Sequence, residues 1–66
     1  MKEFRVVDED MNVYGEFDGI VAACRESNKV SGTSVYVMDL KTKTIKEILS
    51  DKTVEYFANY ELSHVR

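Results

Sequence analysis

The sequence predicts an α+β fold, with an antiparallel four-stranded sheet made from two hairpins and two helices on one face, in the order ββαββα. Two observations predict it. In each half of the chain, two short β-branched stretches flank a polar turn, which is typical of a hairpin. In each half, an amphipathic segment with helical periodicity then follows an Asp. The 66 residues contain no proline and no linker, so we expect a single domain over residues 1–66.

The first hairpin should pair residues 4–7 with residues 13–17 around a turn rich in Asp and Asn, whose side chains bond their own backbone. Alternation along the second strand places Val13 on the core face and Tyr14 on the opposite face. Gly15 within this strand indicates either a bulge or the close approach of a helix.

The first helix is expected over Ile20–Lys29, with Asp18 as its N-cap. Its apolar side, which includes Cys24, is narrow and carries small residues, so the helix can lie close to the sheet. Asn28 or Gly32 should provide the left-handed residue at its end.

The second hairpin contains the strongest strand signal, Ser34–Leu40, which should pair with Thr44–Leu49. The turn between them requires a residue in the left-handed region, although no glycine is present there. Tyr36 and Met38 alternate with two valines on the first of these strands, so apolar residues occupy both of its faces.

The last helix is expected over Val54–Val65, with Ser50 or Asp51 as its N-cap. Tyr56 and Tyr60 lie one turn apart beside its apolar arc. They extend the apolar surface of the helix beyond the width that one sheet face needs.

The predicted core consists of apolar residues on the covered sheet face and the inner sides of the helices. These are Val6 or Phe4, Val13, Phe17, Ile20, Cys24, Val35, Val37, Ile45 or Ile48, Leu49, Val54, Phe57, Ala58, Leu62 and Val65. The uncovered sheet face should carry Tyr14, Tyr36 and Met38, with Val7 as a further candidate. Such a face is unusually apolar for one exposed to water.

Composition and charge limit the classes of function. The formal net charge is −3, with six acidic and two basic residues in residues 1–24 and six basic and four acidic residues in residues 25–52. Neither half has the concentrated basic stripe of a nucleic-acid-binding protein. One cysteine cannot form an internal disulfide and fits a reducing cytoplasm. We find no apolar leader segment and no apolar run long enough for a membrane span, so we expect a cytoplasmic protein without a membrane partner.

The first turn has part of a calcium-binding pattern. Asp8, Asp10 and Asn12 have the spacing of the first ligands in an EF-hand loop. Val13 then stands where the loop needs glycine, and Gly19 stands where it needs a bidentate glutamate. We therefore expect neither a metal site nor a cofactor, and a metal or small-molecule sensor is only a third hypothesis.

No catalytic constellation emerges from the sequence. Cys24 lies in mid-helix on an apolar side, where a thiol is a small buried hydrophobe rather than a nucleophile. The neighbouring carboxylates Asp8, Glu9 and Asp10 lie in a turn, where hydration keeps them ionised and unsuited to paired acid–base work. We expect the protein not to be an enzyme.

The function that best fits these observations is a small protein-interaction module, an inhibitor or accessory protein of the kind that phages and mobile elements encode. A core of this size yields only ~3–5 kcal/mol, so a permanent partner or a homodimer would help to stabilise it. The predicted partner-binding residues are Tyr14, Tyr36, Met38, Tyr56 and Tyr60.

Two alternatives involve nucleic acid. In the first, the chain is a nucleic-acid-binding accessory domain that uses Lys41, Lys43, Lys46 and Lys52. In the second, it mimics nucleic acid through an acidic surface made of Asp8, Glu9, Asp10, Glu16 and Asp18.

Overall fold

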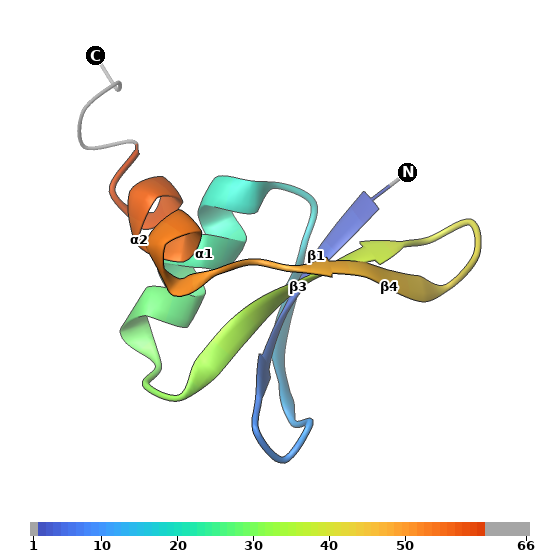
Figure 1. The fold of residues 1–66 in the computed structure, drawn as a ribbon, viewed down its shortest axis with the longest axis horizontal. Coiled ribbons are helices and arrows are strands. Elements are labelled where there is room, and N and C mark those ends of the chain that lie inside the picture. Colours follow the sequence, from blue (N-terminus) through green and yellow to red (C-terminus); the bar gives the residue numbers. More distant parts are fainter. Residues whose placement is uncertain (1, 61–66) are drawn as a thin grey trace.

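The order ββαββα is confirmed by the computed structural model, which describes residues 2–60 (Figure 1). Its elements are β1 (Lys2–Asp8), β2 (Val13–Phe17), α1 (Ile20–Lys29), β3 (Thr33–Asp39), β4 (Thr44–Ile48) and α2 (Asp51–Ala58). The strands form one antiparallel sheet in the order β2-β1-β3-β4. The first strand of each hairpin is therefore central, and the second strand of each hairpin is an edge.

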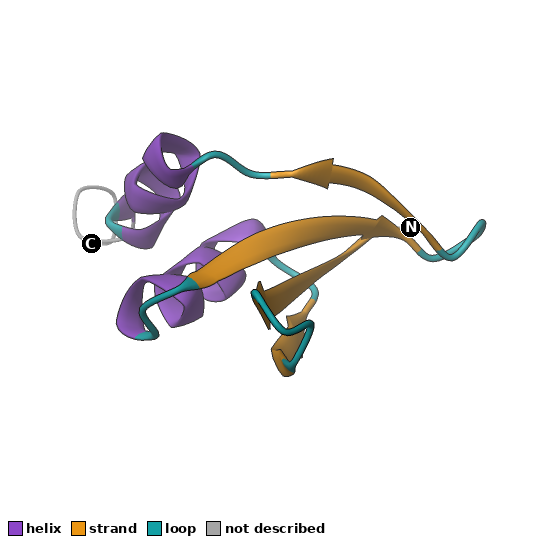
Figure 2. Cartoon of the chain, turned by 60° about the horizontal axis from the view of Figure 1, so that its bottom comes forward, coloured by secondary structure: helices purple, strands orange, loops and turns teal. Residues whose placement is uncertain are grey.

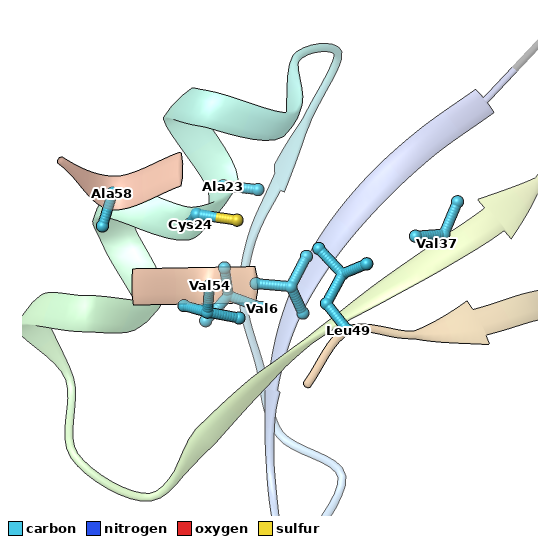
Figure 3. Close-up of a cluster of buried hydrophobic side chains, with 8 residues drawn as sticks. Val6, Ala23, Cys24, Val37, Leu49, Val54 and Ala58 are labelled. Atoms are coloured by element: carbon cyan, nitrogen blue, oxygen red, sulfur yellow. The ribbon is translucent and has the colours of Figure 1, made fainter. Parts of the chain in front are cut away.

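The buried core joins one face of the sheet to both helices (Figure 3). Val6 and Val35 pair across β1 and β3 and are completely buried. Val37 and Leu49 complete the part of the cluster that comes from the second hairpin. The helices contribute Ala23 and Cys24 from α1 and Val54 and Ala58 from α2. Residues of both helices thus share one cluster with the valines of one sheet face.

Most of the predicted core is confirmed, with some differences of degree. The larger aromatic and aliphatic side chains are only partly buried and pack around the cluster; these are Phe4, Phe17, Ile20 and Phe57. Ala23 is completely buried although it was absent from the predicted core. A small side chain was needed there because α1 lies close to the sheet. Leu62 and Val65 lie outside the described residues. The last helix was predicted over Val54–Val65, whereas α2 begins at Asp51, directly after its Ser50 cap, and ends at Ala58.

The two helices begin differently. At α2, the Ser50 side chain accepts a hydrogen bond from the Thr53 amide at 3.2 Å, which confirms Ser50 as the N-cap. At α1, the prediction of Asp18 as N-cap is wrong. The Gly19 carbonyl accepts the first helical hydrogen bond, from the Ala23 amide, so Gly19 is the N-cap and no side chain caps the helix. Asp18 lies one residue too early.

The end of α1 is set by polar contacts in the loop to β3. α1 ends at Lys29 as predicted, and the Val30 amide donates to the Ser27 carbonyl. The left-handed residue is Gly32, with φ of +80°, and not Asn28, which remains helical. Two residues, Val30 and Ser31, therefore separate the last helical residue from Gly32.

The helices lie together at one end of the sheet, and the β3–β4 hairpin extends away from them (Figure 2). α1 packs on β1, β2 and β3, whereas α2 packs mainly on α1 and reaches the sheet at β3. All five residues of β4 are consequently exposed.

Candidate interaction surface

The sheet face that points away from the core follows from strand alternation. Val35 and Val37 are buried in the core, so Tyr36 and Met38, which alternate with them on β3, belong to the opposite face. We call this side of the sheet the open face. Both side chains keep part of their surface exposed, as the sequence predicted for this face.

A β-bulge in β4 adds two isoleucines to the open face. Ile48 pairs with Tyr36 and Ile45 pairs with Met38, while Lys46 is the extra residue between them. In a regular strand, residues three apart would point to opposite faces. Because of the bulge, both isoleucines instead lie beside the β3 residues with which they pair. Ile45 is 47% exposed and Ile48 is 54% exposed.

These residues define the open patch, a continuous apolar surface on two neighbouring strands. It consists of Tyr36 and Met38 from β3 and Ile45 and Ile48 from β4. The prediction that either Ile45 or Ile48 enters the core is wrong. No sequence signal marked the bulge at Lys46, because the strand contains neither glycine nor a change of composition at that position.

A second bulge corrects the prediction for β2. Val7 pairs with Val13 and Val6 pairs with Gly15, so Tyr14 is the extra residue. Val13 therefore lies on the open face with 51% of its surface exposed, and its predicted place in the core is wrong. Gly15 was the sequence signal, and the bulge that it indicated is confirmed.

Tyr14, the bulge residue of β2, bonds the first turn and is not part of the open patch. Its hydroxyl donates to the Asp8 carboxylate at 3.0 Å, and this bond to an anion raises the pKa of Tyr14. The two residues line a shallow hollow of about 290 Å³ together with Ser31 and Gly32. Tyr36 reaches the same turn at another residue, since its hydroxyl lies 3.9 Å from the Met11 sulfur.

The strip of the open face beside the patch is occupied by an ion-paired cluster on β1 and β2. The Arg5 guanidinium lies 2.7 Å from a carboxylate oxygen of Glu3 and 3.5 Å from one of Glu16. The hydrogen bond to Glu3 raises the pKa of Arg5. In register, Arg5 lies opposite Tyr36 and Glu3 lies opposite Met38. The open patch is therefore bordered on one side by charges that already have partners.

The first turn is organised by one carboxylate. Asp8 accepts hydrogen bonds from the amides of Asp10 and Asn12, from the Asn12 side chain and from Tyr14. These donors, the Asn12 amide first, hold the pKa of Asp8 below its ordinary value. Both carboxylate oxygens of Asp8 thus accept hydrogen bonds that close the turn. Elsewhere too, residues 2–60 contain no group of three acidic, His or Cys side chains that could hold a metal ion.

The acidic residues of the first hairpin do not form one surface. Glu9 and Asp10 are exposed in the turn, and Asp18 is exposed at the far end of β2. The five residues of β2 separate these ends by ~16 Å. Glu16 lies between them but is within reach of Arg5.

The basic residues of the alternative nucleic-acid hypothesis also separate. Lys41 and Lys43 lie in the β3–β4 turn and Lys46 lies in β4, whereas Lys52 lies in the first turn of α2. Three of the four are thus exposed on one hairpin, and the fourth lies on a helix.

The tyrosines of α2 form a second apolar surface. The Tyr56 ring meets the Phe57 ring edge to face, with centroids 5.0 Å apart, and lies 5.9 Å from the Tyr60 ring. Phe57 packs against the core and lies 6.0 Å from Tyr60. The three rings cover part of one another, although Tyr56 remains 59% exposed.

Cys24 is completely buried, and this burial raises the pKa of its thiol to about 11, which confirms it as a core residue. A hollow of about 310 Å³ lies between the end of α1 and the start of α2. Within residues 2–60, no helix has the length and apolar character to cross a membrane.

Comparisons with protein-family models, with curated proteins and with solved structures gave no match to this chain.

Proposed function

We propose that the chain is a small, non-enzymatic protein-interaction module that binds another protein through the open patch. The observation that carries this proposal is the patch itself, four apolar side chains set side by side by strand register on the face away from the core. Contiguous apolar surface of this kind marks binding sites on small soluble proteins. An inhibitor or accessory protein acting in the cytoplasm is the role that we propose for such a module.

The open patch fits this role better than the tyrosines of α2. The rings of Tyr56 and Tyr60 pack against each other and against Phe57, so part of their apolar surface is already removed from water. By contrast, the isoleucines of the patch belong to a strand whose residues are all exposed. A flat sheet face lined by aromatic, Met and Ile side chains resembles the apolar centre of a protein interface.

A photo-crosslinking experiment tests the proposal. A photoreactive phenylalanine derivative would replace Met38 in the patch or, as a matched control, Ala22 on the exposed side of α1. In extracts of the cell that encodes the chain, we expect the Met38 position to label one specific protein and the Ala22 position not to. Excess unlabelled wild-type protein should suppress this labelling.

Competition with variants shows whether the patch is responsible. We expect an excess of Tyr36→Glu to suppress the labelling at least tenfold less well than the wild type, and an excess of Ala22→Glu to suppress it fully. Circular dichroism would confirm that both variants are folded. Equal labelling from both crosslinker positions, or equal competition by both variants, would contradict the proposal. Both patch positions lie on β3, away from the outer edge of the sheet.

A further inference from the structure

The outer edge of β4 has the backbone groups that another strand could pair with. β4 pairs with β3 on one side, and no strand among residues 2–60 pairs with its other side. The Leu49 amide donates to the Val35 carbonyl at 3.0 Å, so the backbone of Leu49 faces β3. Because backbone groups alternate along an antiparallel strand, the N–H and C=O of Ile48 face outward. The backbone N–H and C=O of Ile45 also face outward, because Ile45 pairs with Met38 in the same way that Ile48 pairs with Tyr36.

The sequence of β4 matches itself when read in the antiparallel direction. If a two-fold axis passes between Lys46 and Glu47, the Lys46 of one copy lies opposite the Glu47 of the other. Ile45 of one copy then lies opposite Ile48 of the other, and the two outward-facing positions coincide. Within residues 45–48, every cross-strand pair is therefore either apolar or oppositely charged, and both kinds of pair stabilise a sheet.

The bulge is what makes this match consistent with the faces of the sheet. A two-fold axis normal to the sheet keeps each side chain on its own face, so opposed residues must point the same way. Ile45 and Ile48 would not meet that condition in a regular strand, because they are three positions apart. The bulge at Lys46 places both on the open face. The apolar pairs of the two copies would thus lie on one surface.

The charges also select this register over others. An exposed lysine on an edge strand normally discourages pairing with another strand. Lys46 is such a residue, but in this register alone it meets the carboxylate of Glu47 from the other copy. A second copy of the chain is therefore the occupant that complements the edge in charge, in apolar contact and in backbone direction.

We propose that two copies of the chain associate through β4, in antiparallel fashion, about a two-fold axis between Lys46 and Glu47. The two sheets become one continuous sheet, and the open patches of both copies meet on a single face. This inference goes beyond the proposed function, because it concerns the edge of the sheet and would hold whether or not the open patch binds another protein. One strand edge is a small interface, so we expect dissociation in the micromolar range.

Sedimentation of the full chain with paired charge variants tests the proposal. Glu47→Lys places lysine opposite lysine, and Lys46→Glu places glutamate opposite glutamate, so we expect each variant alone to be at least tenfold weaker in self-association than the wild type. Both positions are exposed, and circular dichroism should show unchanged folds. Mixing the two variants restores attraction at both pairs, and we expect the mixture to form a heterodimer about as tightly as the wild type.

Hydrogen exchange provides a readout of the register. The amide of Ile48 should exchange more slowly as the wild-type concentration rises, and this dependence should be absent in Glu47→Lys. A wild type that remains monomeric at near-millimolar concentration, or single variants that associate as well as the mixture, would overturn the proposal. Neither result would change the crosslinking expected from Met38, so failure here is distinguishable from failure of the proposed function.

Discussion

The two hairpins share their turn chemistry but differ in their surroundings. In each, the first strand ends in an Asp whose side chain accepts backbone N–H groups, Asp8 in one and Asp39 in the other. Each turn contains one non-glycine residue with positive φ, Met11 at 67° and Lys43 at 59°. Each second strand contains a bulge. Yet α1 packs against β2, whereas every residue of β4 is exposed.

This difference shows that a hairpin's shape and its burial have separate origins. Turn and bulge arise from contacts within a few residues, and both halves of the chain make them. Burial depends on where a helix packs, and α2 packs on α1 instead of crossing β4. β4 is thus left exposed along its whole length, whereas Gly15 and Phe17 of β2 are partly buried, and the proposed interactions rest on that asymmetry.

The largest expected effect tests the difference in burial. Val35→Ala removes two methyl groups from a completely buried position, so we expect it to lower the free energy of unfolding by about 2–3 kcal/mol. Ile48→Ala, at the half-exposed position in β4, should cost less than about 1 kcal/mol. Urea unfolding at low protein concentration measures both. Equal losses would show that β4 is covered in solution.

The second prediction concerns the bulge in β2 of the first hairpin, at Gly15. A Cβ on Gly15 would lie 2.7 Å from a ring carbon of Phe17, so Gly15→Ala must displace that ring from the edge of the core. We expect a loss of about 1–2 kcal/mol in the free energy of unfolding. The control is Gly19→Ser, which adds a Cβ where no atom lies within 4 Å and should change stability by only a few tenths of a kcal/mol.

A double variant identifies the cause of that loss. In a Phe17→Leu background the ring is absent, so Gly15→Ala should cost clearly less than in the wild type. An unchanged cost would mean that backbone conformation, and not the ring, requires glycine at this position.

The third prediction tests whether the two hairpin turns are equivalent in backbone strain. Met11 and Lys43 adopt the left-handed conformation, which disfavours every residue with a Cβ. Met11→Gly and Lys43→Gly should therefore each stabilise the fold, by about 0.5–1 kcal/mol and to a similar extent. Lys41→Gly, elsewhere in the second turn, should stabilise nothing. If only one of the two variants stabilises the chain, the turns are not equivalent.

The smallest expected effect is on the pH dependence. The pKa values of Asp8 and Asp39 are held below the ordinary 3.8 by backbone N–H groups, so their charged forms stabilise the folded state. That contribution is present above 3.8 and is lost as the pH falls through the lowered values. Thermal unfolding in acid should show a weaker pH dependence for Asp8→Asn than for Asp39→Asn, because Asp8 accepts four hydrogen bonds and Asp39 accepts two.

Much of the candidate surface could be anticipated from the sequence, and part of it could not. The sequence predicts Tyr36 and Met38 on the open face, because they alternate with Val35 and Val37 on a regular strand. The same alternation fails for Tyr14, because a bulge interrupts β2 at that residue. The sequence predicts either Ile45 or Ile48 in the core, because apolar character alone does not distinguish the two faces of a sheet.

Local patterns in the chain were enough to establish the order of elements, the hairpin turns, the bounds of α1 and a cap of α2 at Ser50 or Asp51, because each depends on residues close in sequence. The packing of the folded chain settled which apolar side chains meet water. That outcome depends on a single extra residue in β4, Lys46, and on the contact of α2 with α1. The bulge lies within one hairpin, but no residue type in β4 signals it. The contact of α2 with α1 joins segments that are distant in the chain, and the spacing of residues within either segment does not encode it.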